Sequence, residues 1–442
     1  MIDKIKKYLM GSVFRKGASI LTFLTLGSYV LGLGRDILFA RFFGASRSLD
    51  IYNAAFIIPD LLLNIFVAGA LSAAFVPVFS HLLAKNEKEE AEKTATTMLF
   101  SAPIMMLVLS VPAFIFMPYL SSLVAPGFSG QEKSLLVLMS RLMLLSPIIF
   151  AASNTLGNIL VSYEKFFAYG LSPIFYNLGI IAGIPLTYKF GLLGLVIGTL
   201  GGAMLHLLVR IVGTAESQLR LRFPIDIRSP NFKRVLKLMI PRMAGQPIEQ
   251  ITFFIFTNMA SVLAAGSIAI LSFARNFESV PVSIFGVSFA TAIFPSLSRK
   301  AALGDTKGFL YHLKEAVKPL LIVSVASSLF FIFFGEFFIR IFFGGQRFTE
   351  ADVLRTGKLL AFFALAIPAE SFIHLLVRAF YALKDTLTPI LISVPGLVLI
   401  AILAKVLIPT FSLNAMGLSY FIASTIEALV LFFILRIKLS KL

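Results

Sequence analysis

The chain has 442 residues, of which 58% are hydrophobic and only 14% are charged. A soluble domain has no interior large enough to bury so much apolar surface, so the solvent of this chain must be lipid. Lipid offers no partner to backbone N–H and C=O groups, and the long apolar runs exclude the alternating strands of a barrel. The spanning elements must therefore be helices.

The formal net charge of +17 does not indicate a nucleic-acid partner, because Lys and Arg are spread over alternate loops instead of one tract. The absence of Cys and the four scattered His argue against a metal site and against thiol chemistry. Neither a P-loop nor an HExxH motif occurs, which disfavours ATP use, zinc chemistry and an enzyme in general.

Taken in chain order, the sequence begins with an amphipathic segment, 1–16, that alternates apolar residues with Lys and Arg. Roughly 20 residues are needed per span, which predicts about a dozen transmembrane helices. We expect six in an N-lobe, 17–213, then a basic cytoplasmic linker, 214–234, and six in a C-lobe, 235–442. The expected spans are 18–40, 51–84, 95–119, 134–162, 167–186, 191–213, 235–264, 267–297, 312–335, 356–382, 386–408 and 413–436.

The distribution of basic residues predicts the orientation. With a cytoplasmic N-terminus, the Lys- and Arg-rich loops and the 436–441 tail all lie inside, as the positive-inside rule requires. Both termini are then cytoplasmic, and the number of spans is even.

An internal repeat relates the two halves. A shift of 218 positions places the run 75–80, Phe-Val-Pro-Val-Phe-Ser, over the run 293–298, Ile-Phe-Pro-Ser-Leu-Ser. Because each half has an even number of spans, the halves share one topology, as in parallel-repeat transporters. The predicted fold is an all-α polytopic membrane protein of about twelve transmembrane helices, arranged in two parallel six-helix repeats around a central cavity.

Ionisable residues inside the spans are the first candidates for a functional site, because each costs several kcal/mol unless it faces water or a partner. Arg35 and Asp36 end the first span, Asp50 opens the second, and Asp60 lies deeper in it. Arg275 and Glu278 share one helical face at i, i+3. This last pair fits either a self-neutralised ion pair or a mixed polar binding site.

A second group is a candidate for coupling or gating. Glu370, His374 and Arg378 follow at i, i+4 and i+8 on one helix, and Glu427 lies in the last span. Such a stripe fits either a polar seam between helices or a path for protons or cations.

Several motifs together resemble one known family. They are the runs 34–45 (GRDILFARFFGA), 59–62 (PDLL), 69–78 (GALSAAFVPV), 274–275 (AR), 295–298 (PSLS) and 380–385 (FYALKD). In this order and at this spacing they are similar to the MurJ (MviN) family of lipid II flippases, within the MOP exporter superfamily.

The resemblance implies two lobes around a cavity that alternately opens to each side of the membrane. By the family pattern, Arg35 and Arg275 match arginines that contact a pyrophosphate, and Asp36, Asp50 and Glu278 match acidic positions that hold or gate them. Leu63 and Asn64 stand where consecutive arginines are usual after a Pro-Asn-Leu-Leu run, Asp60 replaces the Asn of that run, and Tyr29 stands where another arginine is common. The substrate-binding candidates are thus Arg35, Arg275, Asp36, Asp50, Asp60, Asn64 and Glu278. The family often has two further helices after the twelve expected here.

The implied function is transfer of an undecaprenyl-diphosphate-linked peptidoglycan precursor, lipid II, from the inner to the outer leaflet of the bacterial cytoplasmic membrane. No cofactor is implied beyond a coupling cation, H⁺ or Na⁺, and the partners are the lipid-linked glycan, the membrane and other cell-wall synthesis proteins. The alternatives are an O-antigen-type flippase, a MATE-like cation-coupled drug antiporter, and a membrane-embedded glycosyl- or phosphotransferase. The short outer loops, poor in carboxylates and His, speak against the transferase.

Overall fold

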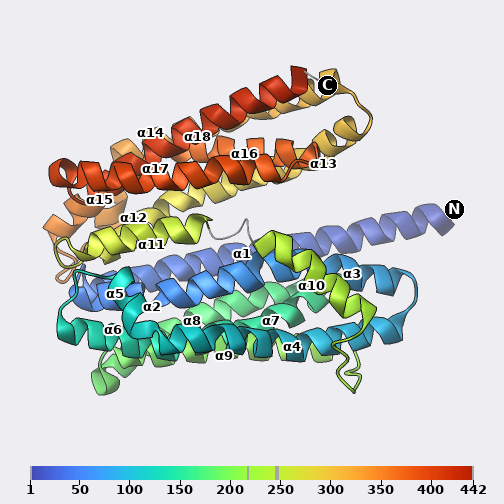
Figure 1. The fold of residues 1–442 in the computed structure, drawn as a ribbon, viewed down its shortest axis with the longest axis horizontal. Coiled ribbons are helices and arrows are strands. Elements are labelled where there is room, and N and C mark those ends of the chain that lie inside the picture. The colour runs from blue at the N-terminus through green and yellow to red at the C-terminus, as the bar shows by residue number, and fades with distance from the viewer. Residues whose placement is uncertain (1, 217–218, 244–247, 441–442) are drawn as a thin grey trace. The chain divides into compact units, whose positions relative to one another are not determined.

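The computed structural model describes residues 2–216, 219–243 and 248–440, with the side chains of 2–19, 67–70 and 241–242 outside the description. All regular elements in these ranges are helices (Figure 1). Contacts divide the chain into unit 1, Met1–Phe42 with Ile51–Gln250, and unit 2, Phe43–Asp50 with Ile251–Leu442.

Unit 1 contains most of the first ten helices and a π-helical segment, η1. Their bounds are α1 Ile2–Phe43, α2 Arg47–Leu63, η1 Asn64–Leu71, α3 Ser72–Ala84, α4 Lys88–Ile115, α5 Met117–Val124, α6 Gly130–Met143, α7 Leu145–Ser162, α8 Phe166–Phe190, α9 Leu193–Ala215 and α10 Pro230–Met243. Residues 2–16 form the start of α1, but the side-chain faces of the predicted amphipathic segment, 1–16, lie outside the described residues.

Unit 2 contains eight further helices and a second π-helical segment, η2. Their bounds are α11 Ile248–Ser261, α12 Ser267–Pro281, η2 Val282–Val287, α13 Ser288–Ala302, α14 Thr306–Phe343, α15 Glu350–Ala364, α16 Ile367–Ala382, α17 Leu387–Phe411 and α18 Asn414–Ser440.

The helices are long and apolar enough to cross a membrane at ten places in the described residues, or eleven if the bent pair α15 and α16 is one span. The two halves of that pair, expected as a single span 356–382, meet at 41°. The expected span 51–84 is divided into α2, η1 and α3. The expected span 235–264 overlaps two helices, α10 and α11. Residues 244–247, between these helices, lie outside the described residues.

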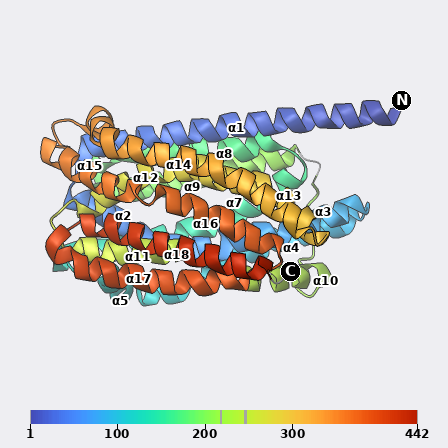
Figure 2. The same ribbon diagram turned by 90° about the horizontal axis from the view of Figure 1, so that it is seen from above.

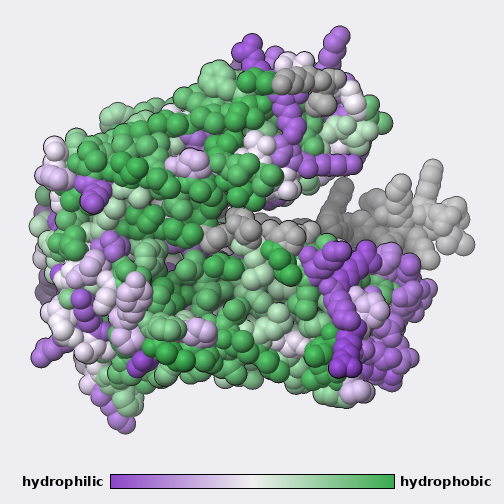
Figure 3. Space-filling model, in the orientation of Figure 1, coloured by the Kyte–Doolittle hydropathy of each residue, from purple (hydrophilic) through white to green (hydrophobic). Residues whose placement is uncertain are grey.

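The distribution of hydrophobic and hydrophilic residues over the surface agrees with a membrane environment. Hydrophobic residues cover the sides of the long helices in each unit, and hydrophilic residues gather at helix ends, as over α10 in unit 1 (Figure 3). Such a belt of apolar side chains is what lipid-facing helices require.

The helix boundaries repeat along the chain as the sequence shift predicts. The C-termini of α1 and α11 lie 218 residues apart, as do those of α3 and α13, and so do the first residues of η1 and η2. Later in each half the shift grows: the first residues of α8 and α17 lie 221 positions apart, and both helices have 25 residues. The most extensive helix contact is between α8 and α9 in unit 1 and between α17 and α18 in unit 2, and the helices of each pair run side by side (Figures 1 and 2).

The basic segment after α9 is attached to α4 in unit 1. The Arg222 guanidinium Nε donates to Glu92 Oε2 at 2.9 Å, and the Arg222 and Asp226 backbone N–H groups donate to Thr96 and Thr97 hydroxyls. Contacts also place α10 with unit 1, although the sequence analysis put 235–243 at the start of the C-lobe. The lobe boundaries stay a prediction.

Candidate functional site

Arg35 lies on α1 in unit 1 and makes contacts with one carboxylate and one amide. Its Nε and Nη2 donate to Asp36 Oδ1 at 3.0 and 2.8 Å, and its Nη1 donates to Asn177 Oδ1 at 3.2 Å. The Arg35 side chain keeps 24% of its surface exposed, whereas that of Asp36 keeps 9%. A guanidinium held in this way is oriented but still accessible to a further anion.

Asn177 is fixed on α8 by its own helix. Its Nδ2 donates to the Pro173 carbonyl at 3.1 Å and to Ser28 Oγ at 3.5 Å. The amide oxygen is therefore the end that faces Arg35. Asn177 was not among the predicted site residues, because the contact joins positions 142 residues apart.

Two tyrosines surround the same region of unit 1. The Tyr52 hydroxyl is hydrogen bonded to Thr199 Oγ1 at 2.9 Å, and Tyr52 and Tyr176 both interact electrostatically with Arg35 and Asp60. Asn64 uses its Nδ2 to donate to the Asp60 backbone carbonyl at 2.9 Å, where α2 passes into η1. The structure thus brings four of the predicted residues of the N-lobe, Arg35, Asp36, Asp60 and Asn64, to one region of unit 1.

Asp50 has a different position. It belongs to unit 2, where Oδ2 accepts the Gly266 N–H at 2.7 Å and Oδ1 accepts the Ala269 N–H at 2.9 Å. These groups form the N-terminus of α12, whose first N–H groups have no partner within the helix. Both carboxylate oxygens of Asp50 are therefore engaged in capping α12. Its predicted contact with substrate stays a prediction.

Arg275 lies on α12 in unit 2 between two carboxylates. Its Nη1 forms an ion pair with Glu278 on the same helix, and Nη1 and Nη2 donate to Glu370 of α16 at 3.2 and 3.1 Å. Nη2 also donates to the Tyr420 hydroxyl at 3.0 Å, and the guanidinium lies over the Tyr420 ring, 4.5 Å from its centroid. The Arg275 side chain keeps 8% of its surface exposed, and that of Glu278 is fully buried.

The cluster of Arg275, Glu278 and Glu370 carries one positive and two negative formal charges. Glu278 Oε1 is buried and accepts no hydrogen bond from the described part of the chain. Two carboxylates around one cation in a low-dielectric setting favour the uptake of one proton. The arrangement is thus more than a self-neutralised pair, which was one of the two interpretations that the sequence left open.

The other predicted coupling residues lie near this cluster or on the neighbouring helix α18. His374 interacts electrostatically with Glu370 one turn away on α16, and Arg378 lies over the Phe294 ring at 5.9 Å from the centroid. Glu427 on α18 accepts a hydrogen bond from Ser393 Oγ at 2.5 Å and interacts electrostatically with Glu370. Glu370 is the residue that joins the predicted stripe to Arg275.

Sequence reasoning missed one ionisable residue of unit 1. Arg210 on α9 is 3% exposed and binds Ser172 Oγ, the Ser153 carbonyl and Asn154 Oδ1. An Arg inside the apolar run 191–213 is the signal that could have found it, since such a charge needs a partner or a wet cavity.

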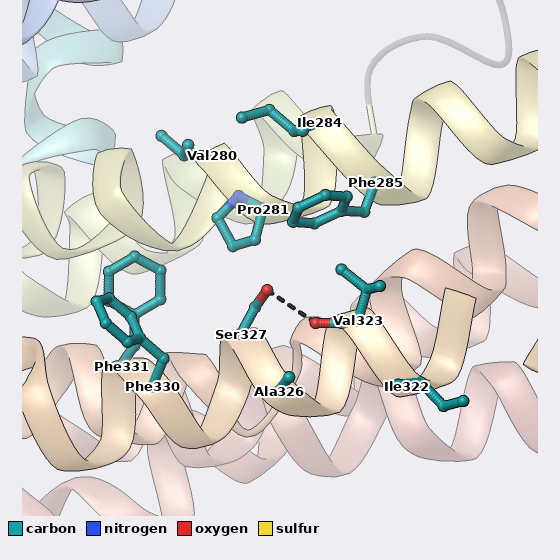
Figure 4. Close-up of a pocket in the computed structure, with 10 residues that line it drawn as sticks. All are labelled: Val280, Pro281, Ile284, Phe285, Ile322, Val323, Ala326, Ser327, Phe330 and Phe331. Carbon is teal, nitrogen blue, oxygen red and sulfur yellow. Dashed lines mark hydrogen bonds between the residues drawn. The ribbon is translucent and has the colours of Figure 1, made fainter. Parts of the chain in front are cut away.

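Unit 2 also has an apolar groove between α12–η2 and α14, with a volume of about 410 Å³ (Figure 4). Pro281 and Phe285 face Val323 and Phe331 across it. The Ser327 hydroxyl in its lining donates to the Val323 carbonyl of its own helix at 2.8 Å. Such a lining suits hydrocarbon and offers nothing to a charged headgroup.

Comparison with known proteins places these observations in one family. A sequence model described as Lipid II flippase MurJ matches residues 39–442. A protein of Borreliella burgdorferi named "Probable lipid II flippase MurJ" is 27% identical over 418 residues, covering 93% of this chain and 81% of its own length.

Solved structures agree. One titled "Lipid II flippase MurJ, inward closed conformation" has a TM-score of 0.81 at 29% identity, over 94% of this chain and 87% of its own. An inward-facing multidrug resistance MATE transporter of the MOP superfamily has a TM-score of 0.75 at 18% identity, over 95% of this chain and 94% of its own. The second likeness shows the fold alone.

Proposed function

The chain belongs to the lipid II flippase MurJ family, and on that premise we propose that it transfers lipid II from the cytoplasmic to the outer leaflet by alternating access. The observation that carries the proposal is the oriented and partly exposed side chain of Arg35. It is oriented by Asp36 and Asn177 yet keeps a quarter of its side chain exposed.

The chemistry of the cargo fits this arginine. A lipid diphosphate carries about two negative charges, and a planar guanidinium binds such oxygens in pairs. Hydrogen bonds to charged groups are each worth about 1.5–3 kcal/mol, enough to hold a headgroup and still release it. The prenyl chain is hydrocarbon and remains in contact with apolar helix surfaces, where a charged headgroup would be costly.

Unit 2 supplies the coupling step in this proposal. Arg275 is balanced by more carboxylate charge than it needs, so one proton on the pair Glu278 and Glu370 makes the cluster neutral. Gain and loss of that proton, driven by the membrane potential, resets the transporter. No covalent step on the cargo is needed, so we propose transport without catalysis, and both chain termini on the cytoplasmic side.

The proposal is tested by leaflet-resolved labelling of lipid II in cells in which this protein is the sole flippase. Arg35→Gln should leave lipid II in the inner leaflet, whereas Lys189→Gln, which removes an exposed cation at the end of α8, should not. Normal outward labelling with Arg35→Gln, at equal protein level, would reject the role of Arg35. Export of a cationic dye that survives Arg35→Gln but not Glu370→Gln would indicate an antiporter instead.

A further inference from the structure

Arg210 is a buried cation in unit 1 whose partners are all uncharged. Its Nε donates to Ser172 Oγ at 2.9 Å, and its Nη1 donates to the Ser153 carbonyl at 2.9 Å and to Asn154 Oδ1 at 2.7 Å. The guanidinium also lies over the Tyr169 ring, 5.0 Å from the centroid. Within the described ranges, no carboxylate forms an ion pair with it.

The surrounding helices are shaped to hold this side chain. A Cβ at Gly157 would lie 2.5 Å from Arg210 Nη1, so a larger residue there would force the guanidinium to move from this position. Pro173 has no N–H for the Tyr169 carbonyl one turn before it, and Ser172 Oγ donates to that carbonyl at 2.9 Å while accepting from Arg210. Arg210 is thus built into α7, α8 and α9 despite the cost of burying an unbalanced charge.

A cavity of about 280 Å³ lies beside it. Arg210 and Tyr169 line one side, and Thr25, Ser28 and Tyr29 of α1 line the other. Within the described residues the hydrogen bonds of Arg210 use Nε and Nη1 only, and Nη2 is not among the buried polar atoms that lack a partner, so Nη2 keeps some contact with open space. The Nη2 group is therefore the donor that remains for an occupant of the cavity.

The lining determines the chemistry of that occupant. A single buried guanidinium without a counter-ion calls for an anion, and the hydroxyls of Ser28, Thr25 and Tyr29 can donate to further oxygens of it. The cavity lies on membrane-spanning helices, and Leu21 adds an apolar wall. We propose that this cavity binds the phosphate group of a membrane lipid.

This site is separate from the one proposed for Arg35 and does not depend on the identity of the cargo. Ser28 and Arg35 lie seven residues apart on α1, about two turns, or roughly 10 Å. Asn177 contacts both residues: its Nδ2 donates to Ser28 Oγ, and its Oδ1 accepts from Arg35 Nη1. A phosphate held by Arg210 would therefore lie one side chain away from the Arg35 site.

The test is native mass spectrometry of the full chain in detergent, with dioleoylphosphatidylglycerol and dioleoylglycerol as probes with the same acyl chains. The wild type should retain the phosphate lipid at least about tenfold better than the lipid without phosphate. Equal retention of the two lipids would overturn the proposal. Retention of inorganic phosphate at millimolar concentration, without retention of either lipid, would also overturn it, since the ligand would then be a free anion.

Variants locate the binding. Thr25→Phe adds a ring to the lining of the cavity at a residue that makes no hydrogen bond with Arg210, and should lower retention at least about fivefold. Leu26→Phe adds the same ring to an exposed neighbouring position that does not line the cavity, and should change nothing. Arg210→Lys keeps the charge but loses the fork, and should bind less than the wild type and more than Arg210→Gln. Unchanged retention in both Thr25→Phe and Arg210→Gln would contradict the site.

Discussion

The two units repeat several helix boundaries at a fixed shift, yet they hold their intramembrane arginines with different partners. In unit 1, Arg35 has one carboxylate and an amide, and Arg210 has only hydroxyl, amide and carbonyl oxygens. In unit 2, Arg275 lies between two carboxylates and a phenol. The formal charges of these bonded sets add up to +1 in unit 1, all of it from Arg210 because Arg35 and Asp36 balance each other, and to −1 in unit 2.

This difference in charge indicates that the two repeated units have different functions in transport. A set with excess positive charge gains from an incoming anion, while a set with excess carboxylate gains from an incoming proton or cation. We infer that unit 1 receives the anionic headgroup and that unit 2 carries the coupling step.

The largest effect is expected at Arg275. Arg275→Ala leaves Glu278 and Glu370 buried together without their cation, which should lower the free energy of unfolding by about 3–5 kcal/mol. Thermal unfolding of the purified protein in detergent measures this. Combining Arg275→Ala with Glu278→Gln should recover much of the loss, and a double variant no more stable than the single one would contradict the charge argument.

Asn177→Asp would give Arg35 a second carboxylate and so make it resemble Arg275. We expect flipping to fall at least about tenfold while the protein stays folded, because the added negative charge competes with the diphosphate for the guanidinium. Leaflet-resolved labelling of lipid II measures the effect. Asn177→Gln retains an amide and is the matched control; wild-type flipping by Asn177→Asp would break the comparison between the two arginines.

A third variant tests the carboxylate of unit 2 that has a capping role. Asp50→Ala removes the acceptor of two N–H groups at the start of α12, and should cost about 1–2 kcal/mol of unfolding free energy. Asp50→Asn keeps one acceptor oxygen and should cost less. If both variants unfold at the wild-type temperature but fail to flip lipid II, Asp50 acts on substrate and not on the helix.

The smallest effect is expected at Asp385, in the loop between α16 and α17. Burial raises the pKa of its carboxyl, but hydrogen bonds from Lys438 and Thr388 outweigh this and lower it to about 2. The ion pair therefore contributes stability above pH 4, and this contribution is lost as the pH falls from about 4 towards 2. Because Lys438 is 37% exposed, the contribution should stay below about 1 kcal/mol.

The measurement is the unfolding temperature of the wild type and of Asp385→Asn between pH 2 and pH 7. The two curves of unfolding temperature against pH should differ above pH 4 and approach each other as the pH falls towards 2. A constant difference across the range would rule out titration of Asp385 as the cause.

The sequence predicted the helical class, the repeat shift and the intramembrane charges because each depends on local composition or on spacing along one chain. Arg275 with Glu278 was found from i, i+3 spacing alone. The partners Asn177 and Tyr420 were not, since they lie 142 and 145 residues from their arginines and are brought there only by packing. The capping role of Asp50 could not be predicted either, because its carboxylate oxygens accept N–H groups of a helix more than 200 residues away in the sequence.

The central claim, that the anionic headgroup binds through unit 1, is tested most directly by the affinity of the detergent-solubilised protein for a polyprenyl-diphosphate lipid. Arg35→Gln should weaken binding at least about tenfold, while Glu370→Gln should leave it within about twofold of the wild type. Tight binding by Arg35→Gln together with lost binding by Glu370→Gln would contradict the account.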